Sequence, residues 1–249
     1  MKLISYGNTN IGRKRKANQD SFRMEPGSKL FVVADGMGGH AGGELASKIT
    51  VDTIVDSILS DKSAMLTAMS PTDMIIGAVH RANSAVFSRA EKDKSLTGMG
   101  TTVLALLFDA VRLVIGHVGD SRVYVARKNE LWQLTRDHSL VNEKLKAGLI
   151  TREQMKKDKN RNVITRSVGF ESSVLVDSYQ KEINVGDVYL ACSDGLSGLV
   201  SDPDILDILN KHAFEGDSLE PAVNALIERA NFNGGDDNVT VVLVRVEKD

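Results

Sequence analysis

Apolar runs that end in an aspartate recur along this chain, and they constrain its fold more than any other feature. Each run has the composition of a short β-strand, and glycine or serine follows the aspartate at once. Strand ends are rigid places from which to present a side chain. The three runs are Val32-Val33-Ala34-Asp35-Gly36, Ile115-Gly116-His117-Val118-Gly119-Asp120-Ser121 and Leu190-Ala191-Cys192-Ser193-Asp194-Gly195.

A fourth acidic site has the reverse order, because Asp236-Asp237-Asn238 stands directly before the strand-like run Val239-Thr240-Val241-Val242. If the four strand ends converge, their negative charges repel one another unless protons or a cation neutralise them. The pattern therefore favours a sheet fold whose strand ends gather around a hard divalent cation. The alternative is that each Asp-Gly pair simply forms a turn.

Oxygen atoms dominate the candidate ligands. The chain has one cysteine, and its histidines are dispersed without a zinc-ligand spacing. This donor set points away from zinc and copper and toward Mg²⁺, Mn²⁺ or Ca²⁺. Gly36 offers a further oxygen, since a residue without a side chain lets its backbone carbonyl approach an ion. The histidines, which we interpret mainly as structural, are His40, His80, His117, His138 and His212.

Strand-like and helix-like segments are interspersed along the chain. Gaps of turn length separate consecutive strand-like runs such as 113–118 and 122–126, which predicts antiparallel hairpins and meanders rather than βαβ units. The sequence therefore favours an α+β layered sandwich with helices packed on sheets. Strands are expected at 30–34, 102–108, 112–118, 122–126, 188–192 and 239–246, and helices within 45–59, 75–86, 205–209 and 222–227.

The chain reads as one domain. Its 249 residues contain four prolines, and no Gly/Ser-rich or Pro-rich tract marks a linker. With 42% hydrophobic residues it can bury a substantial core. We expect a single domain over 1–249, in which the polar segment 137–174 forms a mobile surface flap with short helices near 140–147 and 152–157.

Composition excludes several classes of function. A formal charge of −2 leaves no electrostatic footprint for nucleic acid. One cysteine excludes an internal disulfide framework and favours a reducing compartment. The N-terminus does not resemble a signal peptide, and no apolar run approaches the roughly 18 residues of a membrane span. We expect a soluble, cytoplasmic monomer that binds neither membrane nor nucleic acid.

The same acidic motifs carry a family resemblance. Taken in order with their neighbours, they resemble the bacterial branch of the metal-dependent protein phosphatases, known as PPM or PP2C-like. Seven ordered motifs over the whole length are far more specific than any one. They are Arg15-Lys16-Ala17-Asn18-Gln19-Asp20-Ser21, Asp35-Gly36-Met37-Gly38-Gly39-His40, Gly98-Met99-Gly100-Thr101-Thr102, Gly116-His117-Val118-Gly119-Asp120-Ser121-Arg122, Thr135-Arg136-Asp137-His138-Ser139, Ser193-Asp194-Gly195-Leu196 and Asp236-Asp237-Asn238-Val239-Thr240.

This resemblance implies a four-layer αββα sandwich, with two central, mainly antiparallel sheets and a binuclear Mn²⁺ or Mg²⁺ centre at one end of them. It implies a third, weaker ion as well. The implied roles are Asp35 bridging both metals, the Gly36 carbonyl on one metal, Asp194 and Asp237 on the other, Asp20 acting through metal-bound water, Asp120 at the third ion and Arg15 on the substrate phosphate.

The implied activity is hydrolysis of phosphoserine and phosphothreonine in proteins. Two metals can lower the pKa of a water molecule and neutralise charge on the phosphoryl oxygens, so that no covalent phosphoenzyme is needed. Arg15 can donate two parallel hydrogen bonds to a phosphate, which lysine cannot do. The resemblance suggests a bacterial serine/threonine kinase and its phosphorylated targets as partners.

Three positions depart from the family pattern. Gln19 replaces the usual glutamate and removes a charge near metal-bound water. Met37 occupies the place of a histidine that is the proposed general acid in eukaryotic members, which leaves protonation of the leaving group unassigned. Phe170 ends a segment, begun at Thr165, that often ends in aspartate, so we assign no metal ligand there.

Other interpretations of single residues stay open. Arg15 lies in the basic stretch 13–16, which could be a solvated surface, and Asp120 could occupy a hairpin turn. No Gly-Lys-Ser/Thr follows the glycines around Asp35, which argues against a nucleotide P-loop. Cys192 lacks an arginine six residues on, because Gly198 stands there, and we expect it to be a buried strand residue rather than the nucleophile of a cysteine phosphatase.

Two other functions compete with an active protein phosphatase. One is a catalytically silent module that binds phosphoproteins, motivated by Gln19 and Phe170; the complete set of Asp35, Asp194 and Asp237 argues against it. The other is a hydrolase of small signalling phosphates.

Overall fold

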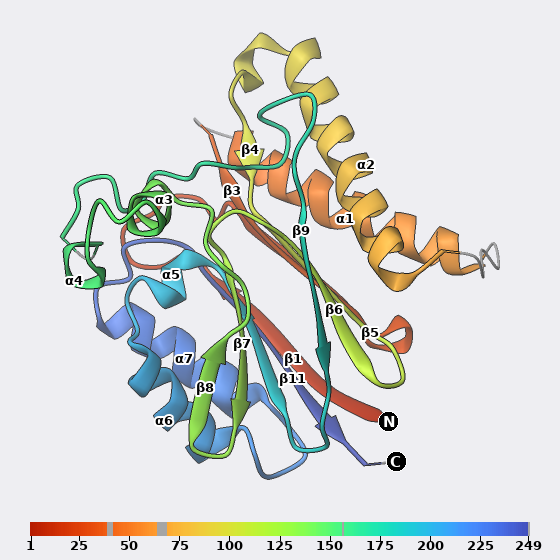
Figure 1. Cartoon of the computed structure of the whole chain (residues 1–249), viewed down its shortest axis with the longest axis vertical. Helices are drawn as coiled ribbons and strands as arrows, with labels where there is room; N and C mark the ends of the chain where they lie inside the picture. The colour runs from red at the N-terminus through yellow and green to blue at the C-terminus, as the bar shows by residue number, and fades with distance from the viewer. Residues whose placement is uncertain (39–41, 64–68, 156, 249) are drawn as a thin grey trace.

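Two antiparallel sheets pack face to face, and helices cover the outer face of each (Figure 1). The structure is a computed structural model that describes residues 1–38, 42–63, 69–155 and 157–248. The expected α+β, four-layer αββα sandwich with mainly antiparallel sheets is confirmed. No helix in the described ranges has the length and apolar character needed to cross a membrane.

The first sheet has the strand order β1-β11-β10-β7-β8, and all of its pairings are antiparallel. The N- and C-terminal strands, β1 and β11, pair along their whole length (Figure 1). The strands are β1 (Lys2–Asn10), β7 (Arg122–Arg127), β8 (Glu130–Gln133), β10 (Val188–Cys192) and β11 (Val239–Glu247).

The second sheet has the order β2-β3-β5-β6-β9, and a two-residue strand, β4, pairs with the end of β3. Its pairings are antiparallel too. The strands are β2 (Asp20–Glu25), β3 (Leu30–Met37), β4 (Gly100–Thr101), β5 (Val103–Phe108), β6 (Arg112–Val118) and β9 (Asp177–Glu182).

Two groups of helices form the outer layers. α1 and α2 cover the second sheet, whereas α5, α6 and α7 cover the first (Figure 1). Short helices α3 and α4 lie in the flap, where the sequence predicted them. The helices are α1 (Gly42–Ser63), α2 (Pro71–Lys92), α3 (Leu140–Lys146), α4 (Arg152–Met155), α5 (Asp194–Ser197), α6 (Asp202–His212) and α7 (Glu220–Phe232), with 3₁₀ turns η1 (Pro26–Ser28) and η2 (Lys94–Leu96).

Alternation along β3 shows how the layers are built. Leu30 and Val32 pack with α1 and α2, whereas Phe31 and Val33 pack between the sheets. Successive strand residues point to opposite faces, so the next residue on the inter-sheet face is Asp35. The hydrophobic pattern of the strand therefore places this carboxylate at the end of the inter-sheet core.

One prediction about the strands was wrong. The runs 113–118 and 122–126 do not form a hairpin, because β6 belongs to the second sheet and β7 to the first. Between them Gly119 has φ 108°, a backbone conformation that L side chains rarely adopt. Asp120 therefore lies where the chain crosses from one sheet to the other, and the alternative of a simple hairpin turn at Asp120 fails.

Other predictions have mixed outcomes. Cys192 is a fully buried strand residue, as expected. The helix predicted at 152–157 is present as α4, and residue 156 lies outside the described residues, as do Gly39 and His40 of the second motif. His117 and His138 are buried, and their rings stack with centroids 4.6 Å apart.

Candidate metal centre

The first two carboxylates face each other across a strand pair. Asp20 begins β2, and Asp35 lies near the end of β3, directly opposite it in the antiparallel register. Cross-strand partners share one face of a sheet, which here is the inter-sheet face that also holds Phe22 and Val33. Two like charges in this position destabilise the sheet unless something neutralises them.

Three further carboxylates approach from other elements. Asp120 follows β6, Asp194 is the first residue of α5 after β10, and Asp237 precedes β11. All of them raise the pKa of Asp35 by charge repulsion, in addition to the larger effect of its burial. Strand ends from both sheets therefore bring the five aspartates together, which meets the condition that the sequence pattern left open.

The pKa values show how unfavourable this gathering is without a cation. Burial, with repulsion from neighbouring carboxylates, raises the pKa of Asp20 to about 7. The same causes raise the pKa of Asp120 to about 7 and also raise that of Asp194. The pKa of Asp35 is raised further still, which favours a proton on Asp35, and donation of that proton to Asp194 lowers the pKa of Asp194 in part.

Asp20 connects the two sheets. Its Oδ2 accepts hydrogen bonds from the Ser193 hydroxyl at 2.8 Å and from the Thr240 hydroxyl at 2.6 Å. Both donors belong to the side of the first sheet, because Ser193 directly follows β10 and Thr240 lies in β11. Its Oδ1 is buried without a hydrogen-bond partner, and so is Oδ1 of Asp120. These two oxygens retain free lone pairs, which is the state expected of groups that a cation can satisfy.

The donor set fits hard divalent cations. Carboxylate oxygens that are buried, mutually repelling and partly unpartnered suit Mg²⁺ or Mn²⁺. Within the described ranges, however, no three acidic, histidine or cysteine side chains are already arranged to hold one ion. Asp20 is turned toward hydroxyl groups and Asp237 toward Arg15.

Gly36 is a glycine because its surroundings leave no room for a side chain. A Cβ there would collide with the backbone carbonyls of Gly43, at the start of α1, and of Gln19. The Gly36 N–H donates to the Gln19 carbonyl at 3.1 Å, and the Asp35 N–H donates to Thr102 Oγ1 at 3.0 Å. These contacts fix the backbone that carries the first predicted ligands.

Arg15 lies in the loop between β1 and β2 and reaches the cluster. Its guanidinium donates to Asp237 Oδ2, and its side chain is half exposed. The neighbouring Lys14 pairs with Asp236, so the basic stretch is held against the loop that precedes β11. Arg15 is therefore part of the site rather than of a purely solvated surface.

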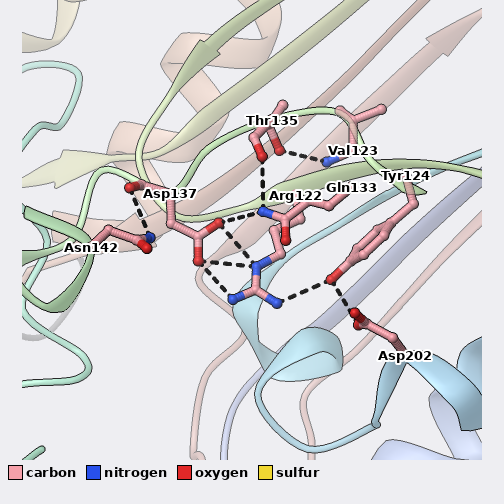
Figure 2. A network of polar contacts seen from close by, with 8 residues as sticks. All are labelled: Arg122, Val123, Tyr124, Gln133, Thr135, Asp137, Asn142 and Asp202. Atoms are coloured by element: carbon pink, nitrogen blue, oxygen red, sulfur yellow. Dashed lines mark hydrogen bonds and ion pairs between the residues drawn. The ribbon is translucent and has the colours of Figure 1, made fainter. Parts of the chain in front are cut away.

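A more buried ion pair, between Arg122 and Asp137, supports the crossing at Asp120. Figure 2 shows the Arg122 guanidinium bound to the Asp137 carboxylate. Its Nη2 donates a hydrogen bond to Oδ2 at 2.7 Å, and its Nε lies 3.0 Å from both carboxylate oxygens. Gln133 also donates to Asp137, and Arg122 donates to the Tyr124 hydroxyl. The root of the flap is thus tied to the strand that follows Asp120.

His138 holds the same crossing from the other side. Its backbone N–H donates to the Gly119 carbonyl at 2.8 Å, and its ring Nδ1 accepts from the Gly119 N–H at 3.0 Å. Burial lowers the pKa of His138 and so favours the neutral ring. Because Nδ1 accepts from Gly119, the proton of the neutral ring lies on Nε2, which faces Asp177 at 3.2 Å. His138 is a structural clamp in the described structure.

Sequence reasoning assigned no role to the hydroxyl groups around the acids. Besides Ser193 and Thr240, Thr102 and Ser121 hydrogen-bond to each other at 2.7 Å between β5 and the crossing. A signal existed for Thr240, which lies on the face of β11 that carries Val242 and Val244. A polar residue on an inward face at a strand end indicates a buried partner.

Known proteins give an independent comparison. A family model described as protein phosphatase 2C matches residues 7–231. The serine/threonine phosphatase Stp of Listeria welshimeri is 37% identical over 239 residues, which cover 95% of this chain and 93% of that protein. A crystal structure of the Mycobacterium tuberculosis serine/threonine phosphatase PstP/Ppp matches with a TM-score of 0.90 and 35% identity over 100% of each chain. The PstP catalytic domain in complex with two manganese ions matches with a TM-score of 0.84 and 35% identity over 99% of each chain.

Proposed function

The chain belongs to the protein phosphatase 2C family and is a serine/threonine phosphatase, and from this premise we propose that it hydrolyses phosphoserine and phosphothreonine in proteins with the help of two divalent cations. The observation that carries the proposal is the convergence of five aspartates, two of which keep a buried oxygen without a partner. The manganese ions named for the PstP catalytic domain support it.

Each site residue has a distinct proposed role. A bound pair of Mn²⁺ or Mg²⁺ ions would lower the pKa of a water molecule and would neutralise negative charge on the phosphoryl oxygens. Asp35 lies among the other four carboxylates and is the proposed shared ligand. The remaining proposed ligands are the Gly36 carbonyl, Asp194 and Asp237, with Asp20 in the outer shell and Asp120 at a third ion.

Arg15 is the proposed phosphate ligand. It already lies against Asp237, and its guanidinium can donate two parallel hydrogen bonds to a phosphate. Residues 1–249 then act as one catalytic unit, with the flap 137–174 attached beside the site through Asp137 and His138. We further propose a bacterial serine/threonine kinase and its phosphorylated targets as partners, a monomeric state and a cytoplasmic location.

Turnover of a phosphothreonine peptide and of p-nitrophenyl phosphate tests this function. Metal-stripped protein should be inactive, excess Mn²⁺ or Mg²⁺ should restore turnover, and chelator should abolish it again. Asp35→Asn and Asp194→Asn should each remove nearly all activity. Asp207→Asn is the matched control, because Asp207 is an exposed acid that pairs with Lys211 on α6, away from the carboxylate cluster.

Other outcomes separate the competing functions. A protein that binds the phosphopeptide in the presence of Mn²⁺ but does not cleave it in a single-turnover assay is a silent binding module. Faster cleavage of free phosphometabolites than of phosphopeptides indicates a small-molecule phosphatase. No turnover with either class at any pH from mildly acidic to alkaline rejects the proposal.

A further inference from the structure

A pocket of about 380 Å³ lies between the end of β3 and the segment 164–175. One wall is Met37, the last residue of β3, and it directly follows the proposed ligand Gly36. The other lining residues lie at the end of the flap, which contributes Ile164 and Phe170, except Leu175, which directly follows the flap. Consecutive Cα atoms are about 3.8 Å apart, so the pocket begins one residue from the proposed metal ligand Gly36.

Two large apolar side chains that line the pocket are exposed to solvent. Phe170 is 61% exposed and Leu175 is 69% exposed, although both are large and apolar. Exposed apolar groups that gather in one place indicate a surface that another molecule covers. The size is also adequate, since small binding sites in proteins usually begin at about 300 Å³.

Phe170 is held in place by its neighbours. The buried Asn83 of α2 accepts a hydrogen bond from the Gly169 N–H at 2.7 Å and donates one to the Glu171 carbonyl at 3.0 Å. Two residues earlier, Val168 forms a pair of backbone hydrogen bonds with Thr101 of β4. Phe170 therefore projects from a fixed backbone, which lowers the entropy cost of binding to it.

The pocket is lined by one basic and one acidic side chain, Arg166 and Glu171. Arg166 lines it, but its guanidinium is bound to Asp177 Oδ1 at 2.6 Å and to the Leu175 carbonyl at 3.1 Å. Glu171 adds a carboxylate to the wall. An acidic side chain that enters the pocket would therefore be repelled by Glu171, and the Arg166 guanidinium is already paired with Asp177.

We propose that this pocket receives a large apolar side chain of the phosphoprotein substrate, one to three residues from the phosphorylated serine or threonine. The occupant belongs to the substrate because the pocket adjoins the site where its phosphate is held, and an extended peptide advances about 3.3 to 3.6 Å per residue. The inference rests on the proposed function and adds a sequence preference to it.

A set of phosphothreonine peptides that differ at one flanking position tests this preference. Leucine, glycine, lysine or aspartate is placed in turn at each position from −3 to +3, and kcat/KM is measured with Mn²⁺. At one position or more, the leucine peptide should exceed the glycine peptide about 10-fold, as is usual for filling an apolar pocket. The aspartate peptide should be the poorest at that position.

Variants then link the preference to the pocket. Phe170→Asp should bring the leucine-to-glycine ratio of kcat/KM down to about 1, and Phe170→Leu should retain most of it. Leu149→Asp is the matched control, because Leu149 is an exposed apolar residue of the same flap, 73% exposed, that does not line the pocket. The rate with p-nitrophenyl phosphate corrects each variant for its content of active protein.

Equal rates for all flanking residues in the wild-type protein overturn the inference, and so does a preference for lysine, which would assign recognition to Glu171 instead. An unchanged leucine-to-glycine ratio in Phe170→Asp also overturns it. If the wild-type protein hydrolyses neither peptide nor p-nitrophenyl phosphate, the proposed function fails. In that case the same peptide series, compared by fluorescence anisotropy with Mn²⁺ present, still decides whether the pocket selects leucine.

Discussion

Asp20 lies at the junction of the two sheets, and its charge is costly there. Burial and neighbouring carboxylates raise its pKa to about 7. We predict that Asp20→Asn raises the free energy of unfolding of the metal-free protein by about 1 to 4 kcal/mol at pH 8, because the charge is gone while the amide oxygen still accepts from Ser193 and Thr240. Turnover should fall about 10- to 100-fold.

Urea unfolding in chelator measures the first effect, and turnover with Mn²⁺ measures the second. Asp187→Asn is the matched control, since Asp187 is also buried but pairs with Arg127 and accepts from Tyr189. This variant should lose about 1 to 3 kcal/mol of stability, the opposite sign. A less stable Asp20→Asn protein would mean that Asp20 is a structural acid rather than part of a cation site.

Arg15 has two candidate partners, the Asp237 carboxylate and a substrate phosphate. We predict that Arg15→Ala lowers kcat/KM on a phosphopeptide about 10- to 100-fold, mainly through KM, because charge-assisted hydrogen bonds contribute about 1.5 to 3 kcal/mol. The same variant should bind Mn²⁺ more tightly in calorimetry, since the guanidinium no longer competes for Asp237.

Arg13→Ala is the control for Arg15, because Arg13 bonds to the Asn231 carbonyl and not to the acidic cluster. It should leave both the Mn²⁺ affinity and kcat/KM within about twofold of the wild type, as for most surface substitutions. Wild-type kcat/KM in Arg15→Ala would remove Arg15 from the phosphate site.

At the scale of elements, the sequence predicted strands well where they are buried and poorly where they are paired but exposed. β6 and β10 were found at their observed bounds because every residue in them except Arg112 is buried, and all of the buried ones except His117 are mainly apolar or small. β9 has a mostly exposed face and no apolar alternation, and it exists because β6 pairs with it. Pairing of this kind is set by distant residues, which a local pattern does not record.

The crossing between β6 and β7 could not be predicted for a related reason. A gap of three residues fits a hairpin and a change of sheet equally well, and the choice depends on what packs around Gly119. In the structure His138 holds its backbone on one side, and the Thr102 side chain lies where a Cβ of residue 119 would be. The spacing alone therefore favoured the wrong element, although it placed Asp120 at the site.

Gly119 provides a test of this crossing. We predict that Gly119→Ala lowers the free energy of unfolding by about 2 to 5 kcal/mol, because a φ of 108° strains an L-residue and the added Cβ overlaps Thr102. Gly148→Ala is the matched control, since Gly148 has φ 71° but open space around it, and it should cost about 1 to 2 kcal/mol. Urea unfolding compares the two, and equal losses would contradict steric crowding at the crossing.

At the scale of the whole molecule, the sequence predicted the acids of the site but not how they are supported. Asp20 to Asp237 span most of the chain; the strand-end pattern made four of these acids candidates and the family resemblance added Asp20, whereas their convergence is seen only in the fold. The contacts of Ser193 and Thr240 with Asp20 depend on how the two sheets pack, although the inward-facing position of Thr240 on β11 was a signal for a buried partner. Met37 and Phe170, noted only as departures, line one pocket because the end of the flap folds beside β3.

The gathered carboxylates also determine how the stability of the whole molecule responds to pH. Burial and repulsion raise the pKa values of Asp20 and Asp120 from 3.8 to about 7. The folded chain therefore binds more protons than the unfolded chain between these values. Their stabilising contribution in the metal-free protein is complete below about pH 4 and is lost as the pH rises through 7.

A divalent cation takes the place of those protons, so Mn²⁺ should stabilise the protein little at pH 5 and most at pH 8. At a concentration about 100 times Kd the gain is about 2.7 kcal/mol, or about 5 to 10 °C in Tm for a chain of this size. Burial also lowers the pKa of His117 from 6.5 to about 3, so the fold loses stability as the pH falls below 6.5. This loss is the same with and without Mn²⁺, and it cancels when the two conditions are compared. The difference in Tm between Mn²⁺ and chelator, measured by calorimetry at pH 5, 6.5 and 8, therefore isolates the carboxylates. Asp35→Asn should reduce the difference at pH 8, and a shift as large at pH 5 as at pH 8 would mean that Mn²⁺ binds elsewhere.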